Sequence, residues 1–265
     1  MSFKRLKDNL LSINNLRKFA GYQIFNLAAQ SHFKLEIPKA VQHGNILVLS
    51  PHPDDDAIGC GATLRLHAEN NSNIKIVYLT DGSNGAEQEL KKDERKKLIE
   101  KREQEAKDAA ELLGVSSLTF WRYEDGQINN NKVTQKLLTT LISSFKPDII
   151  YTPSFLDPHP DHYETCKILY STLKSSDFEG EVWSYEVWSP IYANRIVNVD
   201  KTFDKKELAI LAHKSQLADR SYLSAIRGLN QYRAGMFNVS EYAEAFFACN
   251  RELYIKLFEL INFKK

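Results

Sequence analysis

The stretch Asn45-Ile-Leu-Val-Leu-Ser-Pro-His-Pro-Asp-Asp-Asp56 decides the fold that this sequence predicts. Its first half, residues 45–50, is a short apolar run that is typical of a buried parallel β-strand. Its second half places one histidine and three aspartates within five positions, just where that strand should end. In open α/β sheets, ligands bind outside the carboxyl ends of the strands. The stretch therefore predicts a strand with a polar site at its end.

The segments around this stretch alternate between strand-like and helix-like patterns. Further strands are expected at residues 74–80, 118–121, 148–152, 181–188 and 195–199. Helices are expected at residues 3–30, 57–69, 87–113, 133–145, 204–218, 221–234 and 251–262. Strands that alternate with helices imply βαβ units and a parallel sheet. The predicted fold class is therefore α/β, a Rossmann-like three-layer α/β/α arrangement with a mainly parallel sheet and the active site at the C-terminal edge of the strands.

The length of 265 residues suits one α/β domain with an elaborated end, or at most two small domains. We expect a single domain over residues 1–265, with an N-terminal helical extension at 1–40 and a C-terminal elaboration from about 180 to 265. Hydrophobic residues make up 43% of the chain, which is enough for a sizeable core. Residues 3–30 are expected to form one amphipathic helix or two. This segment has two interpretations: it packs on the domain, or it is a basic interfacial helix that touches a membrane.

Charge and cysteine content exclude several classes of protein. Lys and Arg number 35 against 34 Asp and Glu, so the net charge of +1 argues against nucleic acid as the main partner. We see no signal peptide and no apolar run long enough to span a bilayer. Cys60, Cys166 and Cys249 are widely spaced and form no CxxC pair, which favours a reducing cytoplasm over a disulfide scaffold. The sequence leaves open whether the chain forms a homo-oligomer.

A second polar loop follows the expected strand 148–152 and should open at the same edge of the sheet. It carries Asp157, His159, Asp161 and His162. Imidazoles and carboxylates together suit a divalent metal ion, and zinc is the usual one. Two histidines and one carboxylate would leave a fourth position for an ionisable water, and a further carboxylate could accept its proton. The spacing leaves open which of the aspartates binds the metal.

The first loop has two other interpretations. A single aspartate after a strand is usually a turn or helix cap, and Asp56 could cap a helix that starts at Ala57. The pair Gly59 and Gly61 begins a GxGxxG fingerprint for dinucleotides, but position 64 is Leu and the acidic cluster would repel a pyrophosphate. Glycines that allow close packing of a helix on a strand explain the pair better.

These residues resemble a known family. His52-Pro-Asp-Asp55 and His159-Pro-Asp-His162, each after a strand, are similar to the paired motifs of the PIG-L/LmbE-type zinc deacetylases, which remove acetyl groups from compounds that contain N-acetylglucosamine. The resemblance covers most of the chain from residue 45 onward. Weaker support comes from the loop at 80–85, from Arg102 in a charged helix, and from short matches at 125–126, 213–216 and 243–246.

The resemblance implies a role for each matching residue. It makes His52, Asp55 and His162 the Zn²⁺ ligands and Asp54 the general base. It gives His159 the task of stabilising the tetrahedral intermediate or protonating the leaving amine, with Asp161 orienting it. It places Arg102 against the hydroxyls of the sugar or an attached anionic group, whereas the sequence alone favours a solvated charge.

The chain departs from the family pattern at Asp56, where the family usually has Glu, and in the loop 80–85, which lacks a Glu after its first glycine. The leading hypothesis is a zinc-dependent hydrolase that removes an N-acetyl group from a sugar or glycoconjugate that contains glucosamine. The alternatives are another metal-dependent amide or phosphoester hydrolase, and a non-catalytic zinc-containing carbohydrate-binding protein. For the aromatic residues Trp183, Tyr185, Trp188 and Tyr192, we favour core packing over a wall for a sugar ring.

Overall fold

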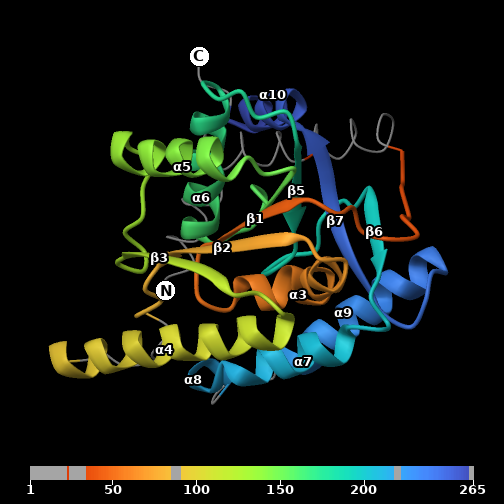
Figure 1. Cartoon of the computed structure of the whole chain (residues 1–265), viewed down its shortest axis with the longest axis horizontal. Coiled ribbons are helices and arrows are strands. Elements are labelled where there is room, and N and C mark those ends of the chain that lie inside the picture. The colour runs from red at the N-terminus through yellow and green to blue at the C-terminus, as the bar shows by residue number, and fades with distance from the viewer. Residues whose placement is uncertain (1–22, 24–33, 85–90, 218–221, 263–265) are drawn as a thin grey trace, which may run out of the picture.

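A seven-stranded sheet runs through the middle of the computed structural model, which describes residue 23 and residues 34–84, 91–217 and 222–262 (Figure 1). The order of the strands across the sheet is β3-β2-β1-β4-β5-β7-β6. In chain order the strands are β1 (Asn45–Ser50), β2 (Asn73–Thr80), β3 (Ser117–Tyr123), β4 (Ile149–Pro153), β5 (Glu181–Tyr185), β6 (Arg195–Asn198) and β7 (Ala243–Asn250). The order of strands reverses at β1: β2 and β3 are added on one side of it, and β4 and the later strands on the other.

The sheet is mainly parallel, as predicted. Strands β3, β2, β1, β4 and β5 pair in parallel, whereas β7 is antiparallel to both of its neighbours. The sequence pattern did not predict β7, because Glu244 interrupts its apolar run. Glu244 is nevertheless buried, and its carboxylate lies 2.6 Å from Nζ of the buried Lys206.

Helices cover both faces of the sheet and complete the three layers (Figure 1). One face carries α3 (Asp55–Glu69), α4 (Lys92–Leu113), α7 (Phe203–Ala212), α8 (Lys214–Leu217) and α9 (Tyr222–Phe237). The other face carries α5 (Lys132–Phe145), α6 (Pro160–Leu173) and α10 (Arg251–Ile261). The helix expected at 204–218 is divided at His213, and α6 was not predicted because the second polar loop runs directly into its first turn.

The alternation of side chains along β1 divides the core between the two faces. Ile46 and Val48 pack under α3 and α4, while Leu47 and Leu49 pack under α5 and α6, and all four are fully buried. Burial of such a side chain stabilises the fold by roughly 1.5–3 kcal/mol. This double burial explains why β1 has a continuous apolar sequence rather than an alternating one.

A glycine allows α3 to approach the sheet closely. A Cβ atom on Gly59 would lie 2.2 Å from Cδ2 of Tyr185 on β5, so no larger residue fits there. The expectation that a glycine serves helix–strand packing is confirmed at Gly59. A Cβ atom on Gly61 would make only ordinary van der Waals contacts, the nearest at 3.5 Å from the side chain of Lys206.

Buried polar contacts connect the C-terminal part of the chain to α3. The carboxylate of Glu244 accepts hydrogen bonds from the backbone N–H groups of Ala62 and Thr63, at 3.1 and 2.8 Å. Thr202 donates its hydroxyl to the carbonyl of Ala62 at 2.9 Å. Residues beyond 180 therefore stabilise the helix that follows the first polar loop.

The predicted N-terminal helix at 3–30 lies almost entirely outside the described residues. Within the part that the structure describes, no helix combines the length and the apolar character needed to cross a membrane. Cys60, Cys166 and Cys249 are free thiols and are buried.

Candidate active site

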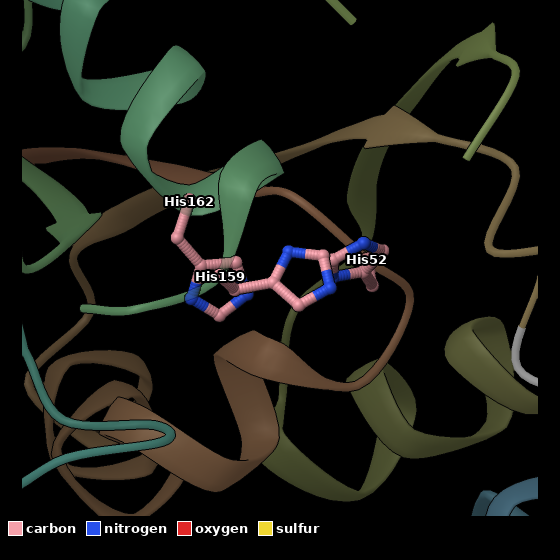
Figure 2. A group of neighbouring side chains, drawn as sticks. All are labelled: His52, His159 and His162. Carbon is pink, nitrogen blue, oxygen red and sulfur yellow. The ribbon is translucent and has the colours of Figure 1, made fainter. Parts of the chain in front are cut away.

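The two polar loops meet at one edge of the sheet because β1 and β4 are adjacent and parallel. His52 lies in the loop between β1 and α3, while His159 and His162 lie at the start of α6. Figure 2 shows the three imidazoles gathered at this edge, and their ring centroids lie 4.6 Å (His52–His159), 4.8 Å (His159–His162) and 5.4 Å (His52–His162) apart. The sequence prediction that residues more than 100 positions apart converge on one site agrees with this geometry.

Asp55 stands between two of the histidines. Its Oδ2 atom lies 3.0 Å from Nδ1 of His52 and 3.2 Å from Nε2 of His162. The same oxygen accepts a hydrogen bond from the backbone N–H of His52 at 2.9 Å. One carboxylate oxygen and two imidazole nitrogens thus face each other in a buried position.

The opposite nitrogen of each of these two rings faces a second carboxylate. Nε2 of His52 lies 3.2 Å from Oδ2 of Asp161 and 3.4 Å from Oδ1 of Asp125. Nδ1 of His162 lies 3.2 Å from Oδ1 of Asp157. Metal-binding histidines commonly have this pattern, because an outer carboxylate fixes the tautomer and the orientation of the ring.

The charges of the cluster favour a cation. Burial alone would lower the pKa of His162, but Asp55 and Asp157 outweigh it and raise the pKa to about 9. The pKa of His52 is raised well above its ordinary value in the same way, against burial, by Asp55, Asp125 and Asp161. For Asp55, burial opposes ionisation, yet His162 and His52 hold its pKa well below the usual range. The carboxylates around the two rings therefore favour positive charge at this position.

The donor set fits a divalent metal ion. Both ring nitrogens of His162 are buried, and neither reaches full hydrogen-bond geometry with the carboxylate that lies 3.2 Å from it. Two groups of possible ligand atoms occur among the described residues, each with its atoms within 4.8 Å of one another: His52, His159 and His162, and His52, Asp125 and Asp161. A mixture of imidazole and carboxylate donors is typical of sites for zinc and similar divalent metals.

Asp54 lies beside the cluster and keeps a different partner. Its Oδ2 atom is 3.3 Å from Nη2 of Arg102, and its side chain is 14% exposed. Arg102 also donates to the carbonyl of Gly82, and a Cβ at Gly82 would lie 2.4 Å from the guanidinium. Only 2% of Arg102 is exposed, and its guanidinium contacts Asp54 and the backbone at Gly82.

His159 is half-buried at the mouth of the cluster, where it begins α6. Its Nδ1 accepts a hydrogen bond from the backbone N–H of Asp161 at 3.2 Å. A neutral ring that accepts at Nδ1 carries its proton on Nε2, so that atom is a donor. Asp161 therefore contacts His159 through its backbone, while its carboxylate faces His52 and accepts from the N–H of Gly126 at 2.8 Å.

Asp56 takes no part in the cluster. It lies in the first turn of α3, where its buried carboxylate accepts hydrogen bonds from the hydroxyls of Ser50 and Tyr78, each at 3.2 Å. Burial raises the pKa of this carboxyl to about 7. The alternative that Asp56 caps a helix starting at Ala57 is wrong, because the helix begins at Asp55 and its N-cap is Asp54.

Asp125 was not predicted as a site residue, although the structure places it beside His52. Asp125 follows β3, so its position at the carboxyl edge of a parallel strand was the available signal. Its carboxylate also accepts from the N–H of Asn84 at 3.0 Å, which joins the loop after β2 to the site. Burial opposes ionisation of Asp125, but the hydrogen bond with His52 leads to a lowered pKa.

Comparison with known proteins gives a consistent result. A protein-family model for PIG-L, described as GlcNAc-PI de-N-acetylase, matches residues 47–173, which include both polar loops. The diacetylchitobiose deacetylase of Thermococcus kodakarensis is 33% identical over 121 residues, which are 44% of this chain and 44% of that protein. The chain therefore spans less than half the length of this relative.

Two further matches cover more of the chain. A probable N-acetyl-alpha-D-glucosaminyl L-malate deacetylase 2 of Bacillus anthracis is 27% identical over 194 residues, or 66% of this chain and 83% of that protein. Among solved structures, the N,N'-diacetylchitobiose deacetylase from Pyrococcus horikoshii covers 96% of this chain and 95% of its own, with a TM-score of 0.71 and 23% identity. At that identity the structural likeness establishes the α/β fold.

Proposed function

Because residues 47–173 of this chain belong to the PIG-L family, we propose that the protein is a metal-dependent hydrolase that removes an N-acetyl group from a glucosamine-containing sugar or sugar conjugate. The observation that carries the proposal is the convergence of two loops on one buried cluster of histidines and aspartates. The free, buried cysteines support a cytoplasmic location.

The proposed metal is Zn²⁺, held by His52, Asp55 and His162. The facing nitrogen and oxygen atoms of these residues, and the outer carboxylates behind both rings, support this ligand set. When bound, zinc would supply Lewis acidity for polarising the acetamide carbonyl and for activating a water molecule.

Asp54 is the proposed general base. It is next to a proposed ligand in sequence, it keeps some exposure to solvent, and Arg102 holds its carboxylate in place. It would accept a proton from the attacking water while the water oxygen bonds to the acetamide carbon. When the C–N bond breaks, the amine nitrogen takes up this proton and acetate leaves.

His159 is the proposed donor to the oxyanion that forms at the acetamide oxygen. Its Nε2–H is oriented by the hydrogen bond that Nδ1 accepts from the backbone of Asp161. A donor placed before the reaction stabilises developing negative charge at little reorganisation cost. Asp161 and Asp125 would support the site by orienting His52.

The experiment that tests the proposed function is acetate release from a panel of N-acetylated sugars, including N-acetylglucosamine and N,N'-diacetylchitobiose, by protein loaded with zinc. We expect acetate from at least one member, and loss of release after treatment with a chelator. Sugar binding without acetate release would favour the carbohydrate-binding alternative. Hydrolysis of a phosphoester panel with two metal ions per chain would favour the other class of hydrolase.

A further inference from the structure

The aromatic segment on and after β5, residues 183–192, contains one tryptophan that is not buried in the core. Trp183 and Tyr185 on β5 are buried, as predicted from the sequence, and Tyr192 is half-buried. Trp188, three residues after the end of β5, is 45% exposed, so the prediction of core packing is wrong for this residue. An exposed indole leaves apolar surface in contact with water, which is unfavourable. The surroundings of Trp188 therefore indicate what its ring could bind.

The backbone of Trp188 is fixed next to the candidate metal site. Its N–H donates to Oδ2 of Asp157 at 3.0 Å. The other oxygen of Asp157 lies 3.2 Å from Nδ1 of His162 and accepts from the N–H of His159 at 2.9 Å. A single carboxylate therefore joins Trp188 to both histidines of the second polar loop.

The ring of Trp188 contacts an aromatic residue of α9. It meets the ring of Tyr222, at the start of α9, edge to face with centroids 6.0 Å apart. Tyr222 lines a small cavity together with Asp54 and His213. The two aromatic residues thus connect the side of the site that holds Asp157 with the side that holds Asp54.

The loop that carries Trp188 is held in one shape by a buried ion pair. Arg233 of α9 pairs with Glu186, and it also donates to the carbonyl of Ile191 at 2.7 Å. Glu186 in turn accepts from the N–H of Ile191 at 2.8 Å. A ring on a rigid loop loses little conformational freedom when a ligand packs on it.

We propose that Trp188 is a specificity-determining residue that stacks against a pyranose ring of the substrate. This inference rests on the proposed function, and it adds the substrate class: ligands that present the apolar face of a sugar ring beside the N-acetyl group. The cluster of histidines and aspartates supplies polar contacts, and the indole supplies an apolar surface at its rim. Ligand sites commonly combine such aromatic surfaces with a few polar groups.

Binding rather than turnover tests the proposal, so that its failure can be told from failure of the proposed function. Calorimetry would measure the Kd of N-acetylglucosamine and of N,N'-diacetylchitobiose for the full chain carrying Asp54→Asn, in the presence of zinc. Adding Trp188→Ala should raise the Kd about tenfold or more, whereas Trp188→Phe should largely restore binding. Tyr232→Ala is the matched control, because Tyr232 is also an exposed aromatic residue but lies elsewhere, on α9.

The two sugars identify the ring that is stacked. A loss with both sugars assigns the acetylated ring, and a loss with the disaccharide alone assigns its neighbour; both support the proposal. An unchanged Kd in the Trp188→Ala protein, or no sugar binding by the Asp54→Asn parent, would overturn it. Melting temperatures of all variants verify folding, and acetate release by the unmodified protein reports separately on the proposed function.

Discussion

Three consecutive aspartates in the first polar loop have three different environments. Asp54 faces Arg102, Asp55 lies between two histidines, and Asp56 is buried against Ser50 and Tyr78. Successive residues on a helix point about 100° apart, so a helix that begins at Asp55 separates their side chains. The chemistry of the loop therefore depends on the position at which the helix starts.

At the residue scale, Asp54→Asn tests the general base. The substitution keeps the size of the side chain but removes its ability to take a proton, so kcat should fall by about 10²–10⁴-fold. Zinc content, measured by atomic absorption, should not change because Asp54 is not a proposed ligand. Asp204→Asn, at an exposed position of α7, is the control. Unaltered deacetylation by the Asp54→Asn protein would show that the assigned base is wrong.

Asp157→Asn tests the carboxylate behind His162. Because the outer carboxylate orients the ring, its loss should weaken zinc affinity by about 10–100-fold while the three proposed ligands remain. Competition with a chromogenic chelator would measure the affinity. Asp55→Asn provides the comparison and should weaken binding further. Equal zinc affinity of the Asp157→Asn and unmodified proteins would contradict the role given to Asp157.

The sequence predicted that the two polar loops meet at one edge of the sheet, but not the contacts within the cluster. The spacing of the motifs left open which aspartate faces the histidines, and His52, Asp55 and His162 follow as a ligand set from the family resemblance. Asp125 was missed, since its contact with His52 depends on the packing of β3 in the sheet. The carboxylate of Asp161 faces His52 rather than His159, which depends on a side-chain direction that spacing does not encode.

At the scale of elements, Gly59→Ala tests the approach of α3 to the sheet. The added Cβ would meet Tyr185, whose hydroxyl is tied to the carbonyl of Leu49 at 2.8 Å, so the ring has little room to move. We expect a loss of about 1–3 kcal/mol in the free energy of unfolding, measured with urea. Gly228→Ala in α9 is the matched control. A Cβ atom on Gly228 would have no neighbour within 4 Å, and alanine should stabilise that helix by up to about 1 kcal/mol.

If both alanine variants changed stability in the same direction, close packing at Gly59 would not be the reason for that glycine. Most elements were predicted from apolar runs for strands or from helical spacing for helices, and β1 was predicted at its observed bounds. Two elements were not. Helix α6 starts inside a polar motif, and β7 contains a glutamate whose burial depends on Lys206 from a distant helix.

At the scale of the whole molecule, the alternation of strands and helices was sufficient to predict three layers. The same alternation could not predict the antiparallel placement of β7 between β5 and β6, because the partners of a strand are chosen by the assembled sheet. The site depends on the parallel part alone. The carboxyl ends of β1, β3 and β4 supply His52, Asp125 and the second loop.

The stability of the whole molecule should depend on pH through His67. This residue of α3 is buried, with Nε2 3.0 Å from the hydroxyl of Tyr151, and burial lowers its pKa to about 4. The unfolded chain, with an ordinary histidine pKa near 6.5, binds the proton first as the pH falls. The stabilising contribution is therefore complete above about pH 6.5 and is lost between about pH 6.5 and 4, by on the order of 3 kcal/mol.

Urea unfolding at several pH values would measure this dependence, with His67→Gln as the comparison. The variant should lose stability less steeply over the same pH range. The Asp56 carboxyl, whose pKa is raised to about 7, acts in the opposite direction over the same range, so the difference in stability between the two proteins isolates the contribution of His67. The raised pKa of His162, about 9, adds nothing to this difference, because the substitution does not change that group. Identical slopes for the two proteins would rule out His67 as the source.

The bond between Glu244 and the backbone of α3 has a consequence for engineering. The segment that matches the family, residues 47–173, holds every proposed ligand, and it looks like a portable module. Yet the carboxylate of Glu244 in β7, some 180 positions later, accepts hydrogen bonds from the amides of Ala62 and Thr63. Transplanting the shorter piece into another scaffold would remove these contacts from the helix that carries Asp55. A transplanted segment should therefore include the C-terminal part of the chain, with β7, as well as the two motifs.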